Sequence, residues 1–220
     1  MSNVYSAHHR ELQDQFDTRR LADLVEGGFI VKEVDDNNKA FIESRDMFFL
    51  SSIDQHGQPT VSYKGGDPGF VKVVDARTIA FPFYDGNGMF YSWGNIAGNP
   101  KVGMLFIDFV NPFRLRVQGT ARVDMNDELM LEYPEAQGVA RVTVDSVWPN
   151  CPRYVHRYQK MKPSRYVPRA QCETPLAGRK RIDIVQPSLA AKDQGKAAGA
   201  GGLLTVEQWF GKVAEGSEEA

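Results

Sequence analysis

The stretch YDGNGMFYSWGNIAGNPKVGMLFID, residues 84–108, decides the fold. It begins with a tight-turn pattern at residues 85–88 and continues with about ten residues that are compatible with a helix. Gly98, Asn99 and Pro100 then end that helix. An unbroken apolar run follows at residues 101–109, which is typical of a strand buried on both faces. The order predicts a single short helix inserted into a β-rich domain.

Short apolar or alternating segments surround this stretch and predict further strands. We expect them at residues 47–53, 59–63, 70–75, 78–84, 113–123 and 138–148, and a helix over residues 8–26 before them. A strand about every ten residues, with helices at the ends, predicts a mostly β domain in the form of a small antiparallel barrel. The composition becomes linker-like after about residue 186. We therefore expect one domain over residues 1–185 and a tail over 186–220 that includes a short helix.

Charge and composition exclude several function classes. The formal net charge is −2 and the pI is about 6.1, whereas binding to nucleic acid requires a basic excess. The chain has no run of about 18 apolar residues that would span a membrane, and its first residues lack the apolar core of a signal peptide. The four histidines do not form a metal-ligand pair on one element. We expect a cytoplasmic protein without a metal site, a nucleic-acid partner or a membrane partner.

Two neighbouring patterns indicate an anion site. Lys64 precedes a Gly-Gly loop, and the turn at residues 85–88 precedes the expected helix. A helix N-terminus offers free backbone N–H groups and the positive end of the helix dipole, and glycines let a ligand approach the backbone. Lys64, Arg114 or Arg116 would supply the cation that a phosphate requires. The alternative interpretation is that both segments are ordinary turns, and these residues alone leave both open.

The strand at residues 113–123 separates its side chains by type. Its polar face carries Arg114, Arg116 and Gln118. Such a face is commonly solvated, but here it directly follows a buried strand and could instead line a cleft or a subunit interface. The aromatic residues between positions 81 and 93 fit the core or a dimer contact, and one or two of the rings could flank an aromatic cofactor.

Several longer stretches resemble the FMN-binding split-barrel proteins related to pyridoxamine 5′-phosphate oxidase. They are AFIESRDMFFLSSIDQHGQPTVSYKGGDPGFVKVVD at residues 40–75, TIAFPFYDGNGMFYSWGNIAGNPKVGMLFID at 78–108, RLRVQGTARV at 114–123 and NCPRY at 150–154. The resemblance covers roughly residues 8–170. It is strongest to the FMN-binding branch that is related to the vitamin B6 oxidase rather than to the oxidase itself.

The resemblance implies a six-stranded antiparallel Greek-key split β-barrel that forms a homodimer with FMN at the subunit interface. It implies that the flavin ring and ribityl chain meet the strand at residues 60–64, and that the phosphate lies at the turn before the short helix. The cofactor-binding residues that it implies are Thr60, Val61, Ser62, Tyr63, Lys64, Phe81, Pro82, Phe83, Asn87, Ser92, Asn95, Arg114, Arg116, Gln118, Trp148 and Arg153. Trp148 and Arg153 would reach the site of the other subunit.

The function that the resemblance implies is that of an FMN-dependent oxidoreductase acting on a small organic substrate. The alternative is a flavin-binding protein without turnover, such as a flavin store or a stress-related carrier, and a more remote one is binding of haem or a deazaflavin. The vitamin B6 oxidases carry a basic Ser-Arg-Lys run near the phosphate turn, where this chain has Asn87, Gly88 and Met89. Their C-terminal Arg/His substrate signature also lacks a clear counterpart, so oxidation of pyridoxamine phosphate is not expected.

Overall fold

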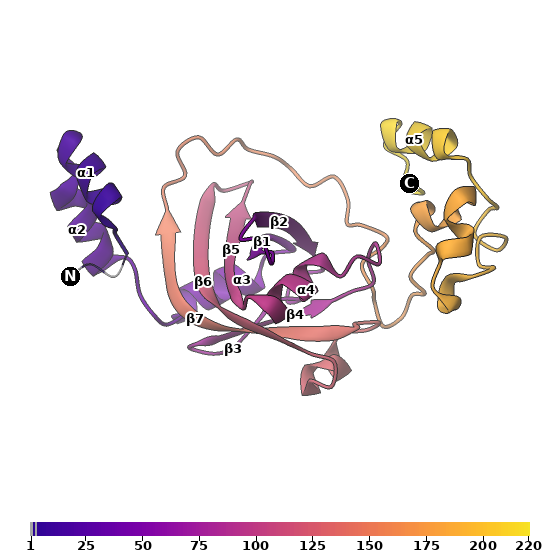
Figure 1. The fold of residues 1–220 in the computed structure, drawn as a ribbon, viewed down its shortest axis with the longest axis horizontal. Helices are drawn as coiled ribbons and strands as arrows, with labels where there is room; N and C mark the ends of the chain where they lie inside the picture. Colours follow the sequence, from indigo (N-terminus) through magenta and orange to yellow (C-terminus); the bar gives the residue numbers. More distant parts are fainter. Residues whose placement is uncertain (1, 3) are drawn as a thin grey trace. The chain divides into compact units, whose positions relative to one another are not determined.

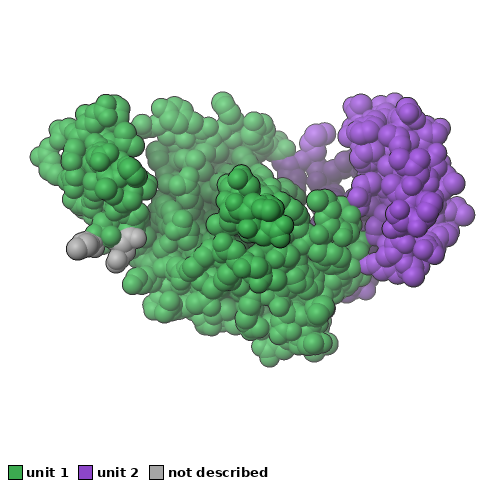
Figure 2. Space-filling view, in the orientation of Figure 1, with its two compact units in different colours: residues 1–159 green, residues 160–220 purple. Residues whose placement is uncertain are grey.

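The computed structural model describes residue 2 and residues 4–220. These residues form two compact units, residues 1–159 and 160–220, which Figure 2 shows in separate colours. The break between the units lies before the boundary that we expected at residue 185. The expected boundary marks where the cofactor-binding domain ends, which the division into compact units does not test, so it stays a prediction.

The first unit is built on one antiparallel sheet (Figure 1). Its strands are β1 (Met47–Ile53), β2 (Pro59–Gly65), β3 (Lys72–Asp75), β4 (Thr78–Phe83), β5 (Lys101–Asp108), β6 (Phe113–Asp124) and β7 (Gly138–Asn150). Their order is β2-β1-β5-β6-β7-β4-β3. The expectation of a mostly antiparallel β domain with helices is confirmed. All seven segments that the sequence pattern predicts as strands are present. The six strands that the resemblance implies are one too few, because β3 adds a seventh at one edge, and the described edge strands β2 and β3 do not pair to close the sheet.

Alternation along the strands builds the core on one side of the sheet. On β1, Phe48 and Leu50 are fully buried, and on β6 the apolar partners Leu115 and Val117 are buried while Arg116 between them is exposed. Complete burial of one such side chain stabilises the fold by about 1.5–3 kcal/mol relative to exposure. The core therefore lies on the face that the period-two pattern of the sequence predicts.

Pro82 occupies a position where a missing N–H does no harm. The pairing of β3 with β4 ends at Ala80, whereas the pairing of β4 with β7 continues to Phe83. Pro82 therefore lies beyond the end of β3, where β4 has a strand neighbour on one side alone. This agrees with the rule that proline is tolerated at strand edges.

Strand β5 departs from the prediction of burial on both faces. Val102, Met104 and Phe106 are buried, but Gly103, Leu105 and Ile107 on the other side are half-buried. The expectation is wrong for the single chain. The described part of the chain therefore covers the apolar side chains on this second side only in part.

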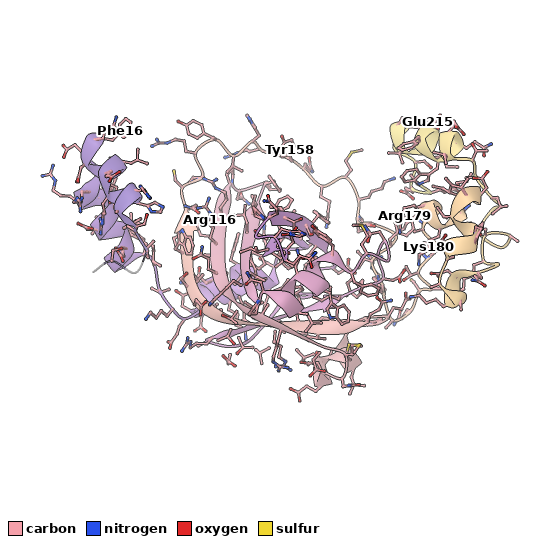
Figure 3. The ribbon with its side chains drawn as sticks, in the orientation of Figure 1. Phe16, Arg116, Tyr158, Arg179, Lys180 and Glu215 are labelled. Carbon is pink, nitrogen blue, oxygen red and sulfur yellow. The ribbon has the colours of Figure 1, made fainter. Side chains whose placement is uncertain are left out.

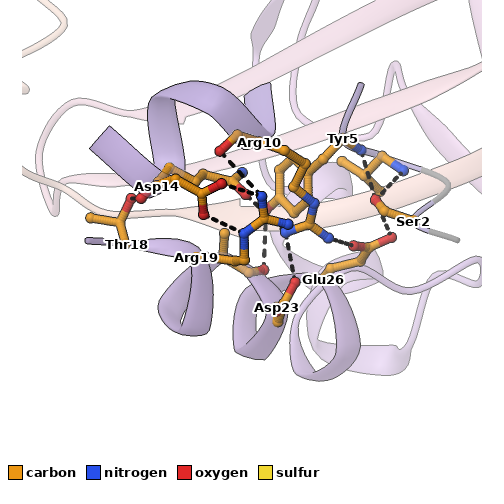
Figure 4. A network of polar contacts seen from close by, with 11 residues as sticks. Ser2, Tyr5, Arg10, Asp14, Thr18, Arg19, Asp23 and Glu26 are labelled. Atoms are coloured by element: carbon orange, nitrogen blue, oxygen red, sulfur yellow. Dashed lines mark hydrogen bonds and ion pairs between the residues drawn. The ribbon is translucent and has the colours of Figure 1, made fainter. Parts of the chain in front are cut away.

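The N-terminal segment forms two helices instead of the one expected over residues 8–26. These are α1 (Ala7–Gln15) and α2 (Arg19–Gly28). The chain reverses between them at Asp17, whose φ of 51° is left-handed and ends a helix. Polar contacts between the two helices hold the pair together (Figure 4), and the apolar periodicity of the sequence did not reveal this turn.

Short helices complete the unit. α3 (Asp36–Glu43) begins with Asp35, whose carboxylate accepts a hydrogen bond from the Asn38 backbone N–H at 2.7 Å. α4 (Tyr91–Gly98) is the helix that the opening stretch predicts, and it packs against β1 and β6. A 3-10 helix, η1 (Glu128–Glu132), precedes β7.

The second unit contains 3-10 turns and one α-helix. The turns are η2 (Gly178–Arg181), η3 (Asp183–Ser188) and η4 (Ala191–Asp193), and the helix is α5 (Val206–Ala214). The expected helix in the tail is confirmed by α5. Among the described residues, every helix is too short or too polar to cross a lipid bilayer.

Candidate functional site

Strand β2 divides the predicted flavin-contacting residues between two faces. Val61 and Tyr63 are exposed, whereas Ser62 and Lys64 lie opposite Leu50 and Phe48, which are fully buried. Side chains of directly opposed residues in an antiparallel pair lie on the same face. Ser62 and Lys64 therefore point to the core side of the sheet, together with Thr60, and Val61 and Tyr63 point away from it.

On the core side, residues from three separate segments meet. The Ser62 and Ser92 hydroxyl oxygens are 3.0 Å apart, and the Lys64 ammonium donates a hydrogen bond to Ser92 Oγ at 3.2 Å. The same ammonium nitrogen lies 4.9 Å from the centre of the Phe83 ring, a cation–π contact. Ser62, Lys64, Phe83 and Ser92, hereafter the Lys64 cluster, bring four predicted residues together.

The Lys64 cluster has a cation that lacks a counterion. In the described part of the chain, no carboxylate lies within ion-pair distance of the Lys64 ammonium. Burial lowers the pKa of Lys64, because removal of water disfavours the charged form. A partly desolvated ammonium whose neighbours are a neutral hydroxyl and a ring is stabilised by an anion placed beside it.

The N-terminus of α4 opens beside this cation. Ser92 is the second residue of α4, and its hydroxyl is the group that contacts Lys64. The first intrahelical bond joins the Gly94 N–H to the Phe90 carbonyl, so the described contacts leave the N–H groups of Tyr91, Ser92 and Trp93 open. No side chain caps the helix. Open N–H groups at the positive end of a helix, next to a lysine, form an anion-binding arrangement.

The residue before α4 has an unusual backbone conformation. Phe90 adopts φ 49°, in the left-handed region that a bulky residue rarely occupies, and its ring packs on Trp93. This conformation directs the chain from the Gly86–Met89 turn into the helix. Sequence reasoning missed Phe90, because left-handed geometry is normally indicated by glycine or asparagine, and the nearest such signal is Gly88 with φ 79°.

Asn87 and Asn95 have different surroundings from the Lys64 cluster. Asn87 is exposed, and its side-chain oxygen accepts a hydrogen bond from the Met89 N–H at 3.0 Å, which stabilises the turn. Asn95 is buried and donates to Ser52 Oγ at 3.1 Å, which ties α4 to β1. Ser52 was also missed, although the alternation of β1 places it on the core side.

Residues at the end of β4 complete this region. Phe81 is fully buried and packs edge-on against Phe48, with ring centres 5.0 Å apart, so it belongs to the core. Tyr84 directly follows β4. Burial, together with the negative charge of Asp67, raises the pKa of Tyr84 to about 12. The Tyr84 hydroxyl is therefore protonated at neutral pH.

The remaining predicted residues lie on the opposite face of the sheet, which we call the outer face. Its central row runs across five strands in register: Tyr63, Phe49, Leu105, Arg116 and Trp148. Gln118 lies in the neighbouring row and accepts a hydrogen bond from Ser146 Oγ at 3.4 Å. Arg116 is exposed beside β6 and β7 (Figure 3). Within one chain, these residues and the Lys64 cluster therefore point to opposite sides of the sheet.

The chain segment after β7 places Arg153 close to the outer face. Arg114 donates from its guanidinium to the Cys151 carbonyl, and the Arg153 N–H donates to Cys151 Sγ at 3.4 Å. Arg153 is exposed, and its guanidinium carbon lies 6.0 Å from the centre of the Tyr154 ring. Arg114, Arg116 and Arg153 have no carboxylate within ion-pair distance in the described part of the chain. The outer face therefore presents several positive charges.

A family model and several solved structures match the chain. The family model described as pyridoxamine 5′-phosphate oxidase matches residues 34–166, which is more than half of the chain. Structures that match include HupZ of Group A Streptococcus, with 16% identity over 57% of this chain and 99% of that chain and a TM-score of 0.45. An FMN-binding protein from Syntrophomonas wolfei has 11% identity over 64% of this chain and 96% of its own, with a TM-score of 0.41.

A further match is HutZ, the haem storage protein of Vibrio cholerae, with 16% identity over 52% of this chain and 93% of that chain and a TM-score of 0.39. No curated protein matches the chain. The residues that the family model matches include the Lys64 cluster and most of the outer face.

Proposed function

The chain belongs to the pyridoxamine 5′-phosphate oxidase family, and we propose that it is an FMN-binding flavoprotein that acts as an FMN-dependent oxidoreductase on a small organic substrate. We further propose that it works as a homodimer with FMN at the subunit interface. The observation that carries the proposal is the Lys64 ammonium beside the open N-terminus of α4.

The Lys64 cluster fits the terminal phosphate of FMN. Lys64 offers a charge, Ser62 and Ser92 offer hydroxyls, and the first turn of α4 offers N–H groups, so every group required to hold a phosphate is present. A dinucleotide such as FAD would have to continue beyond this point. FMN is therefore preferred over FAD in this proposal.

The protein's own residues then perform three tasks. Lys64, Ser92 and the α4 N–H groups hold the phosphate and exclude water from it. Phe83, which contacts the Lys64 ammonium, gives that region an apolar wall. Arg114 and Arg116 on an outer face stabilise negative charge that develops near a flavin ring. When bound, FMN supplies the hydride and electron transfer.

The two-sided distribution of the predicted residues supports a shared site. One planar cofactor cannot contact both sides of the same sheet, but it can contact the core-side edge of one chain and the outer face of another. Leu105 and Ile107 of β5 are apolar and half-buried, which is the pattern expected for a face that a second copy covers. In this proposal, Trp148 and Arg153 of one chain approach the flavin that Lys64 of the other chain holds.

One observation favours the alternative of a flavin carrier without turnover. The Lys64 cluster contains no histidine, aspartate or glutamate, so it has no carboxylate or imidazole for general acid–base catalysis. A protein that only stores flavin requires no such catalytic group. The absence of histidine from the cluster also makes it a poor site for haem, the ligand named for HutZ, since haem iron requires an axial ligand such as histidine.

A titration tests the proposal. The purified protein should be yellow, or it should quench the fluorescence of added FMN at about one FMN per chain and bind FAD more weakly. A colourless protein that leaves the fluorescence of micromolar FMN unchanged would contradict the proposal. Anaerobic mixing with NADH or NADPH, followed by a screen of acceptors, then separates an oxidoreductase, whose flavin bleaches and reoxidises with turnover, from a carrier.

A further inference from the structure

The N-terminal hairpin, residues 4–29 with α1 and α2, leaves its apolar side chains uncovered. No residue of either helix is buried. Five large apolar side chains are between 51% and 68% exposed: Leu12, Phe16, Leu21, Leu24 and Phe29. Phe16 lies at the turn between the helices (Figure 3). Helices of nine and ten residues are marginal in water, so the hairpin requires a surface that covers these residues.

Polar contacts hold the two helices of the hairpin together without covering that apolar side. Arg10 lies 2.7 Å from Asp23 and 3.6 Å from Glu26, and Ser2 donates to Glu26 at 2.9 Å. At the turn, Arg19 pairs with Asp14 (Figure 4). These ion pairs lie between α1 and α2, and because Arg10 faces two carboxylates, the hairpin keeps a net negative charge. The apolar residues therefore remain free for another partner.

The segment that connects the hairpin to the barrel pairs with β7 next to the outer face. The Val31 N–H donates to the Val147 carbonyl at 3.0 Å, and the Val147 N–H donates to the Val31 carbonyl at 2.8 Å. Val147 precedes Trp148, the last residue of the central row of the outer face. The chain therefore enters the barrel next to the face that carries Arg116.

The hairpin and the outer face are complementary in charge. Residues 4–29 contain five acidic side chains and three arginines. On or beside the outer face, Arg114, Arg116 and Arg153 have no ion pair among the described residues. Both surfaces also expose apolar groups, because Val61 and Tyr63 on β2 are 67% and 63% exposed. An acidic apolar surface and a basic apolar surface attract each other and bury apolar area on contact.

We propose that the hairpin of one chain docks on the outer face of a second copy of the same chain, and that a two-fold axis makes the exchange reciprocal. In a single chain, both surfaces are exposed. In a pair of chains, each hairpin covers part of the other copy's outer face and leaves the rest to the flavin of the proposed function, so apolar area of all four surfaces is buried. The inference rests on the homodimer of the proposed function and adds which surfaces form it.

Sedimentation of the full chain tests this docking. Replacing Leu21→Asp and Leu24→Asp together should raise the dimer dissociation constant at least a hundredfold, because two buried leucines are replaced by charges. Val61→Asp with Tyr63→Asp should have a similar effect from the other surface. Leu131→Asp is the matched control, since Leu131 is 95% exposed on η1, outside both surfaces, and the dimer should be unchanged. Circular dichroism checks that each variant is folded.

Three results would overturn the inference. They are a monomeric wild-type chain, an unchanged dimer in the Leu21/Leu24 variant, and a weakened dimer in that variant with an unchanged dimer in the Val61/Tyr63 variant, which would mean that the hairpins pair with each other. FMN uptake is measured on the same samples. A dimer that responds as expected but ignores FMN would refute the proposed function and leave this inference standing.

Discussion

The core-side edge and the outer face of the sheet use positive charge differently. Lys64 is partly buried, its pKa is lowered, and it is held by Ser92 beside a helix N-terminus. Arg116 and Arg153 are exposed and point to solvent. A buried cation without a counterion is held in a fixed position, and its burial has an electrostatic cost that a bound anion relieves. An exposed cation is mobile and is solvated by water, so it has no such cost. We therefore propose that the first region is a preformed anion site and that the second becomes one only when a second chain is present.

The largest effect is expected from an experiment that joins the two regions. Lys64→Ala and Arg153→Ala chains should each bind FMN weakly as homodimers. In a mixed dimer, one site regains both residues and the other loses both, so random mixing should restore tight binding at roughly a quarter of all sites. Fluorescence titration of the mixture measures that fraction. Absence of any restored tight sites would mean that the two regions do not share a flavin.

The second-largest effect is expected from a substitution in the core-side region alone. Lys64→Ala should weaken FMN binding by about ten- to a hundredfold, because a charge-assisted hydrogen bond contributes about 1.5–3 kcal/mol. Lys101→Ala is the matched control, since Lys101 is exposed and pairs with Asp145 at 3.0 Å. Titration of both variants measures the difference. Equal affinities would show that Lys64 makes no contact with the ligand.

A pH dependence sharpens the same contrast. Because the pKa of free Lys64 is lowered and an adjacent phosphate would raise it, FMN binding should be accompanied by proton uptake at alkaline pH. Affinity should therefore be full below the pKa of free Lys64 and fall by up to about tenfold per pH unit above it. Titrations from neutral to alkaline pH measure this fall, and Lys64→Gln should remove it. A fall of the same size in Lys64→Gln would assign the effect to another group.

The smallest effect is expected at the turn before α4. Asn87 is exposed and its oxygen already bonds to the Met89 N–H, so Asn87→Ala should cost FMN affinity about two- to tenfold, the range of a neutral hydrogen bond. The same titration measures it. A loss as large as that of Lys64→Ala would instead show that the Asn87 side chain leaves its turn to hold the ligand.

Local patterns were sufficient to predict the elements that form this site. The turn, helix and strand of residues 84–108 are present in the expected order, because glycine, asparagine and apolar spacing report local backbone preferences directly. The contact of Lys64 with Ser92 could be anticipated only in outline. It depends on the register of β2 with β1 and on the packing of α4, which are set by the whole sheet.

Other features were not accessible from the sequence. The break between α1 and α2 depends on the left-handed backbone of Asp17 and on the pairing of Arg10 with Asp23, which the apolar pattern does not report. A strand was expected at residues 70–75, but its place as a seventh strand at the edge of the sheet depends on the pairing of a four-residue segment. The division of the predicted residues between two faces follows from strand alternation, and the proposed function attributes it to a site shared by two chains.

The most direct test of the central claim, that the Lys64 cluster holds the phosphate of a flavin, compares FMN with riboflavin, which lacks that phosphate. We expect the wild-type chain to bind FMN at least about tenfold more tightly than riboflavin, and the difference to disappear in Lys64→Ala while riboflavin affinity is unchanged. Equal affinity of the wild-type chain for the two flavins, or an undiminished preference for FMN in Lys64→Ala, would contradict the account.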